Sequence, residues 1–339
     1  MKKLFYKFCL TLLIVGCCLA IANFIYTKYY YKNDIEILDA SMLQKIDSLQ
    51  YICDVLYFAE SSNGTVSNND TCQLSISEMI DELSPLNVGA IDHGAVHARS
   101  YLQLIKNIKP NSKVKTLVIT LNSRSFGSPW INSKIETNLA QADIIYEPNF
   151  PIIKRLKLAF NAYDNKSVEM RNLINEKNWS EQKLNVSLNF PYKTVRQWDN
   201  GMANGTYLLP DGKWDSPKIT LACHYIKTYA FSIDTDSNPR IKNFDEIVEL
   251  ANEKKLNLVF HLLAENMQYA DSLVGKELVH IMNENKQLLI DRYTKKGVTV
   301  VNSFNLVNGK DFIDQDWTTE HYNQTGRWIL AKNVVKILR

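Results

Sequence analysis

Short, mainly apolar runs recur along this chain, and helical periodicity fills much of the sequence between them. The runs cover residues 52–59, 87–91, 116–121, 256–263 and 297–303. Their length and low charge are typical of strands that are buried on both faces of a sheet. The spacing of apolar residues predicts helices over 96–108 and 270–293, and a last helix from Gly326.

This alternation of strand and helix predicts the α/β class, with a parallel sheet between layers of helices on both faces. In such sheets, ligands bind in the crevice beyond the carboxyl ends of the strands. Polar residues follow the first three runs, at 60–64, 92–94 and 122–124. We therefore expect the chemistry of the protein at this edge of the sheet.

Residues 128–238 interrupt the alternation. The segment is rich in Asn, Trp and Tyr, contains several prolines, and shows helical periodicity mainly over 152–173. We interpret it as an insertion into a domain of residues 34–339. Two interpretations of the insertion stay open: a lid or substrate platform over the strand ends, or a helical layer with no role in binding.

An uncharged stretch, residues 8–26, precedes this domain and is long enough for a helix to cross a hydrocarbon core of roughly 30 Å. Lysines before it favour a cytoplasmic amino terminus. We predict a cytoplasmic stub and a single transmembrane signal anchor over 1–33, with the domain extracytoplasmic, either periplasmic or extracellular. A cleaved signal peptide and a lipidated Cys17 are the alternatives, and the apolar residues that continue to Tyr26 favour the anchor.

The composition argues against a nucleic-acid partner, because the net charge is only +3 and no Lys/Arg run occurs beyond the amino terminus. Three cysteines, Cys53, Cys72 and Cys223, lie outside the anchor. Either Cys53 pairs with Cys72 in an oxidising compartment, or all three are buried free thiols. Their spacing does not suggest a metal site.

Residues suited to acyl transfer gather at the predicted strand ends and before the last helix. Such a site requires a nucleophilic hydroxyl, a base, a carboxylate that orients the base, and donors for the oxyanion. The candidates are Ser61, Ser62, Gly94, Asn122, Asp314, Asp316 and His321.

The order of these residues resembles the SGNH (GDSL) hydrolase and acyltransferase superfamily over nearly the whole soluble part. Ala-Glu-Ser at 59–61 stands where the family has Gly-Asp-Ser, and His-Tyr-Asn-Gln-Thr-Gly at 321–326 resembles its His-x-Asn-x-x-Gly. The resemblance implies a three-layer α/β/α sandwich. It also implies Ser61 as nucleophile, His321 as general base and Asn122 as an oxyanion donor.

Two of the assigned residues have rivals. We prefer Ser61 to Ser62, because Ser61 follows an acidic residue as the family serine does. Gly94 is expected to supply an oxyanion amide, and Gly89 is the alternative, since either glycine allows close approach of the backbone.

The orienting acid is where the sequence departs furthest from the family. The family has Asp three residues before its His, and Thr318 occupies that position here. We predict Asp316, which needs the shortest loop to reach His321, in preference to Asp314. A serine–histidine dyad is the remaining alternative.

Other polar residues at or near strand ends receive weaker assignments. Arg124 is predicted to bind a carboxylate or phosphate of a substrate, with a salt bridge as the alternative. His93 and His97 have no third ligand nearby, so no metal is expected, nor any other cofactor. His261 lies within a predicted strand and is expected in the core.

The layout of one membrane helix before the domain resembles the D-alanyl transfer protein of teichoic acid modification and the exopolysaccharide acetyltransferases. It implies a serine esterase or O-acyltransferase that acts on acyl esters of a cell-envelope or exported polysaccharide. The expected partners are an acylated carbohydrate or other ester and a membrane-bound O-acyltransferase. The alternative is a catalytically inactive subunit that assists such a transferase in binding or assembly.

Overall fold

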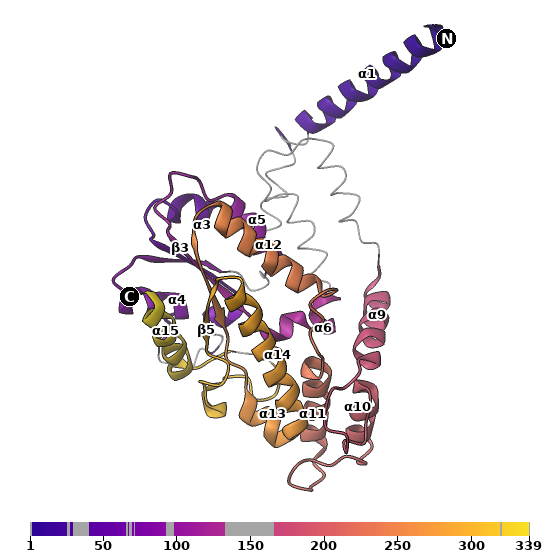
Figure 1. Ribbon diagram of the computed structural model, residues 1–339, viewed down its shortest axis with the longest axis vertical. Coiled ribbons are helices and arrows are strands. Elements are labelled where there is room, and N and C mark those ends of the chain that lie inside the picture. Colours follow the sequence, from indigo (N-terminus) through magenta and orange to yellow (C-terminus); the bar gives the residue numbers. More distant parts are fainter. Residues whose placement is uncertain are drawn as a thin grey trace.

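The computed structural model describes residues 2–25, 28–29, 41–65, 67, 70, 72–92, 98–132, 166–318 and 321–338. Its centre is a parallel sheet of five strands in the order β2-β1-β3-β4-β5 (Figure 1). The strands are β1 Val55–Ala59, β2 Val88–Asp92, β3 Thr116–Leu121, β4 Asn257–Leu262 and β5 Thr299–Asn302. Each strand coincides with its predicted run to within a few residues, so the predicted strands are confirmed.

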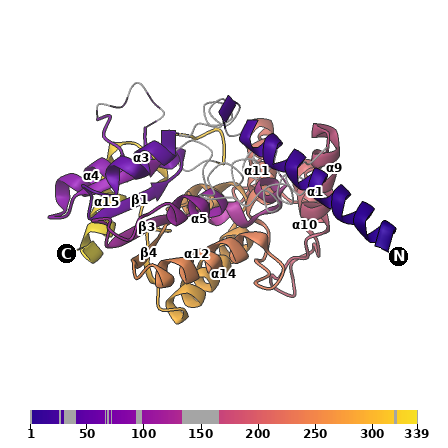
Figure 2. The ribbon, with the colours of Figure 1, turned by 90° about the horizontal axis from the view of Figure 1, so that it is seen from above.

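Helices cover both faces of the sheet. They include α4 Ile76–Leu83, α5 Ala98–Lys106, α12 Pro239–Glu253, α14 Lys276–Lys295 and α15 Gln324–Leu338. Leu56 and Phe58 of β1 belong to a core shared with α5, α12 and α14, whereas Val55, Tyr57 and Ala59 belong to a core shared with α4 and α15. Figure 2 shows α4 and α15 on one side of the strands and α12 and α14 on the other. The predicted α/β fold with two covering layers is confirmed.

The helices differ in detail from the predictions. The segment 270–293 is divided between α13 Met267–Leu273 and α14, because Gly275 between them adopts a φ of +113°, a conformation that favours glycine. Several helices were not predicted, among them α3 Ser41–Leu49, α4 and α12. The start of α4 has a capping box between Ser75 and Glu78, a signal that the sequence did contain.

The segment 128–238 forms α6 Ser128–Ile131, α9 Val168–Glu181, α10 Val195–Ala203 and α11 Ser216–Tyr229, and residues 133–165 lie outside the described part. Helices α9, α10 and α11 stand together beside the sheet (Figure 1). Their shared core is aromatic, and the ring centres of Phe190 and Trp198 lie 4.8 Å apart. At the end of α11, Tyr229 Oη donates to Glu265 Oε2 at 2.8 Å, just beyond β4. The segment therefore reaches the carboxyl edge of the sheet.

At the amino terminus, α1 Lys2–Ile25 is long and apolar enough to cross a membrane, with a mean hydropathy of 2.5 over an 18-residue window. None of its residues is buried, and it projects from the rest of the chain (Figure 1). These properties are compatible with the predicted membrane anchor. Of the two cysteine interpretations, the structure shows free thiols at Cys53, Cys72 and Cys223, of which Cys72 is half-buried.

Candidate active site

Ser61 lies directly beyond the carboxyl end of β1, at the start of the short 3₁₀ helix η2 Ser61–Asn63. The side chain of Asn63 fixes this turn. Its Nδ2 donates to Ser77 Oγ at 3.0 Å and to Asp92 Oδ2 at 2.9 Å, and its Oδ1 accepts the Ser77 backbone N–H at 3.0 Å. Asn63 thus ties the Ser61 turn to α4 and to the end of β2, a role that the sequence analysis had not assigned.

His321 faces Ser61 from the segment that precedes α15. Its Nε2 lies 3.0 Å from Ser61 Oγ, and its Nδ1 lies 2.5 Å from Asp314 Oδ2. The rival serine, Ser62, is buried, and its Oγ has no hydrogen-bond partner within the part of the chain that the structure describes. Ser61, His321 and Asp314 have the connectivity of a Ser-His-Asp triad, in which the carboxylate orients the imidazole and the imidazole contacts the hydroxyl.

Our prediction of the acid beside His321 was wrong. We predicted Asp316, and the structure places Asp314 there. An isolated antiparallel bridge pairs Phe312 with Tyr322. This register puts Ile313 opposite His321, and the Ile313 N–H donates to His321 O at 2.8 Å. Asp314 is the next residue and its carboxylate contacts the imidazole, whereas Asp316 is exposed in the loop that follows. The prediction compared loop lengths only and was wrong because the bridge brings the backbone at Ile313 beside His321, so the next residue, Asp314, reaches the imidazole before the loop begins.

Asn122 follows β3 and begins the 3₁₀ helix η3 Ser123–Phe126. Its Oδ1 accepts the Arg124 backbone N–H at 3.1 Å, and its Nδ2 donates to Glu60 Oε2 at 3.2 Å. Because a backbone N–H is only a donor, the first contact determines which end of the amide is oxygen. The amide donor of Asn122 is therefore directed towards the residue before Ser61, at the same edge of the sheet as Ser61.

Gly94, the glycine predicted to supply an oxyanion amide, lies outside the described residues, as do His93 and His97, which were considered for a metal. The rival glycine, Gly89, is within β2, and a Cβ there would lie 2.7 Å from Cys53 Sγ. Its missing side chain is thus explained by packing. Among the described residues, no group of three or more His, Cys, Asp or Glu side chains is arranged to hold a metal ion.

Arg124, predicted to bind substrate, is only 8% exposed, and its Nη1 donates to Thr318 O at 2.8 Å. Its guanidinium also lies 5.1 Å from the ring centre of Trp130. Thr318 belongs to the loop between Asp314 and His321, so Arg124 supports the segment that carries the acid. Substrate binding by Arg124 stays a prediction.

A buried polar chain lies under the site. Tyr57 Oη is 2.9 Å from His261 Nδ1, and His261 Nε2 is 3.0 Å from Ser303 Oγ. His261 has no exposed surface, and burial lowers its pKa to about 3. Burial also raises the pKa of Tyr57, with a smaller contribution from the Glu60 carboxylate. His261 is therefore a neutral core residue, as predicted.

The sequence of this chain matches no family model, and no curated protein matches it. The interpretation of the site accordingly rests on the positions of Ser61, His321 and Asp314 and on the hydrogen bonds that hold them.

Proposed function

We propose that this protein is a serine esterase or O-acyltransferase of the SGNH type. The observation that carries the proposal is the continuous contact from Ser61 Oγ through His321 to Asp314. The three side chains come from the end of β1 and from the segment before α15, at the edge of a parallel sheet where ligands bind. Asn122, at the end of β3, adds a donor of the required type at the same edge.

In the proposed reaction, His321 Nε2 removes the proton from Ser61 Oγ as the oxygen attacks the acyl carbon of an ester. The carbonyl oxygen becomes an oxyanion, for which the Asn122 amide and the Ser61 backbone N–H are the proposed donors. The C–O bond to the alcohol then breaks, and His321 gives its proton to the leaving oxygen. Asp314 keeps the imidazole in the tautomer that accepts this proton and stabilises the imidazolium.

The acyl group is then carried by Ser61, and its acceptor decides the class of reaction. Attack by water, deprotonated by His321, completes hydrolysis. Attack by a sugar hydroxyl completes a transfer instead. The substrate that we propose is an acyl ester of a cell-envelope or exported polysaccharide.

We place this reaction outside the cytoplasm. The apolar helix α1, with lysines before its apolar stretch, supports a single-pass anchor with a cytoplasmic amino terminus. In this position the domain would meet exported polysaccharide and a membrane-bound O-acyltransferase partner. A protease-protection assay on intact spheroplasts tests the orientation, because an extracytoplasmic domain is digested without membrane lysis.

Fluorophosphonate labelling of the full-length protein in detergent tests the chemistry. An activated Ser61 attacks phosphorus and displaces fluoride, so the wild-type chain should become covalently labelled. Ser61→Ala should abolish the label, whereas Ser62→Ala should retain it, because only the Ser61 hydroxyl contacts His321. No labelling of a folded wild-type protein would instead favour the inactive binding or assembly subunit.

A further inference from the structure

Trp317 is an exposed aromatic residue in the loop that carries Asp314, with 51% of its surface accessible. Its ring packs on the ring of His224 in α11, with the ring centres 4.6 Å apart. The loop contacts α11 again one residue later, where Thr318 Oγ1 lies 3.5 Å from Thr228 Oγ1. The inserted helix therefore holds an exposed aromatic ring close to the proposed triad.

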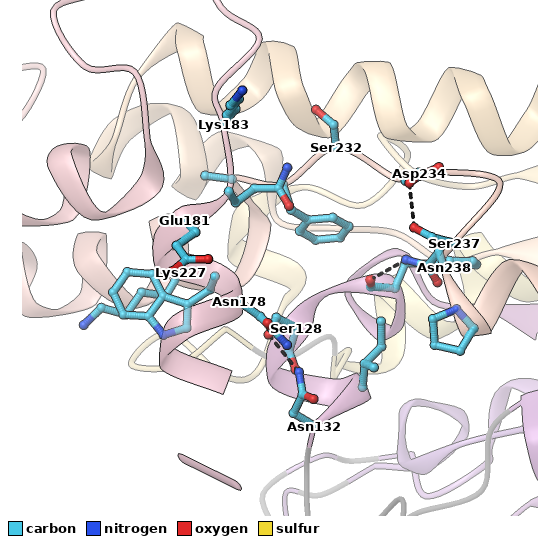
Figure 3. A pocket seen from close by; sticks show the side chains of 17 residues that line it. Ser128, Asn132, Asn178, Glu181, Lys183, Lys227, Ser232, Asp234, Ser237 and Asn238 are labelled. Atoms are coloured by element: carbon cyan, nitrogen blue, oxygen red, sulfur yellow. Dashed lines mark hydrogen bonds between the residues drawn. The ribbon is translucent and has the colours of Figure 1, made fainter. Parts of the chain in front are cut away.

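From His224, α11 leads towards a cavity. Lys227 lies about one turn further along α11, pairs with Asp199 at 3.4 Å, and has its Nζ 5.4 Å from the ring centre of Trp179. Lys227 and Trp179 both line a cavity of about 520 Å³ between α6, the end of α9 and the loop after α11 (Figure 3). Trp317 and the cavity are thus connected along one helix.

The cavity is polar and balanced in charge. Its charged side chains are Lys183, Lys227, Glu181 and Asp234, two of each sign. Figure 3 shows the labelled amide, hydroxyl and charged side chains standing around the open space, with Asn132 and Asn178 at one end and Ser232 at the other. Amide and hydroxyl groups both donate and accept hydrogen bonds, as sugar hydroxyls do.

We propose that Trp317, His224, Lys227, Trp179 and the cavity form a polysaccharide track, which binds an uncharged glycan chain. One sugar of the chain packs its C–H face on Trp317 beside the triad, and further sugars of the chain occupy the cavity. Aromatic rings suit this ligand because a pyranose has apolar faces and a polar rim. The balanced charges, and the pairing of Lys227 with Asp199, give no excess of positive charge for a polyanion.

The track names an uncharged glycan as the substrate class of the proposed enzyme. This part of the inference rests on the proposed function. Its test measures binding by calorimetry on full-length protein in detergent, with Ser61→Ala present to prevent turnover. The probes are neutral disaccharides and hexasaccharides of glucose, mannose, galactose and N-acetylglucosamine, and polygalacturonate as the charged chain. We expect at least one neutral hexasaccharide to bind.

Trp317→Ala should weaken that binding by about tenfold or more, the effect of losing a stacked ring. Asn178→Ala combined with Ser232→Ala should weaken the hexasaccharide but not the disaccharide, because only the longer chain reaches the cavity. The matched control is Trp214→Ala, which removes a tryptophan of similar exposure, 54%, from the chain between α10 and α11. This control should leave the affinity unchanged.

Any of three results would overturn the proposed track. They are equal affinities of the Trp317→Ala and Trp214→Ala proteins, binding of polygalacturonate alone, and no binding of any neutral hexasaccharide. Fluorophosphonate labelling separates this failure from failure of the enzyme. Labelling without glycan binding refutes the track and leaves the serine chemistry standing. Glycan binding that depends on Trp317, without labelling, supports the track in an inactive binding protein.

Discussion

The role of His321 depends on Asp314, which contacts the imidazole Nδ1 at 2.5 Å. Asp314→Asn replaces the carboxylate by an amide of the same shape, which no longer stabilises the imidazolium and favours the wrong tautomer. We expect esterase turnover to fall about 10³- to 10⁴-fold with little change in thermal unfolding. Asp316→Asn is the matched control and should stay within about twofold of wild type, because Asp316 is exposed in the loop. Equal losses in the two variants would contradict the assignment.

The positions of Ser61 and His321 could be predicted from the sequence, whereas that of Asp314 could not. Ser61 and His321 could be identified because each is placed by the element next to it, the end of β1 and the start of α15. Asp314 could not, because its position depends on the bridge between Phe312 and Tyr322, and such a pairing leaves no periodic signal. The partners of Asn63 could not be predicted for a similar reason, since its contacts with α4 and β2 are set by tertiary packing.

Arg327 joins the start of α15 to the segment before α4. Its fully buried guanidinium donates to Asp70 Oδ2 at 2.8 Å and to the backbone oxygens of Leu74 and Tyr322. Arg327→Met would leave a buried carboxylate unpaired, so we expect the free energy of unfolding to fall by about 3–5 kcal/mol. Urea unfolding followed by circular dichroism measures this loss. Lys336→Met, at an exposed site of the same helix, should change stability by less than about 0.5 kcal/mol.

A substitution at the end of α12 should raise the free energy of unfolding. Lys255 adopts a φ of +57°, and the next residue, Leu256, donates its N–H to Ala251 O at 2.9 Å. Helices that end in this way usually have glycine at the left-handed position, because a Cβ is disfavoured there. Lys255→Gly should therefore raise the free energy of unfolding by about 0.5–1 kcal/mol in urea titrations. Lys255→Ala keeps the Cβ and should give no such gain; an equal gain would show that backbone strain is not the cause.

Strands were easier to predict than helix boundaries in this chain. The central strands β1, β3 and β4 are mainly apolar because both faces of the sheet are buried there, and this composition is visible in the sequence. The break at Gly275 was missed because the apolar periodicity continues across it, and a single glycine does not by itself end a helix.

The segment 128–238 was the least predictable part of the molecule. The sequence left open whether it is a lid or substrate platform over the strand ends or a helical layer with no role in binding. The contacts that bring it to the loop before α15, Thr228 with Thr318 and His224 with Trp317, join residues about 90 positions apart. Such contacts arise only when α11 packs on the loop before α15, which no local pattern in either segment encodes.

The stability of the whole molecule should depend on pH through His261, which connects β4 to β1 and β5 by its contacts with Tyr57 and Ser303. Its pKa is about 3 in the folded chain and 6.5 in an ordinary setting, because burial disfavours the charged imidazolium. Between these values the unfolded chain binds a proton that the folded chain does not. The neutral imidazole therefore makes its full contribution to the free energy of unfolding above pH 6.5, and this contribution is lost progressively as the pH falls towards 3.

At pH 5 this loss amounts to about 2 kcal/mol of the free energy of unfolding. Urea titrations at pH 7.5 and 5.0 measure it, in a range above the ordinary pKa of carboxylates. His261→Gln, which cannot be protonated, should lose correspondingly less over the same interval. His224→Gln is the control at a partly exposed histidine. It should change the loss between pH 7.5 and 5.0 less than His261→Gln does, because solvent screens the charge of His224. The imidazole proton resonances of His261 give an independent check. They should not shift between pH 7 and 4 in the folded protein, and a titration near pH 6 would show that His261 is reached by solvent and does not limit stability in acid.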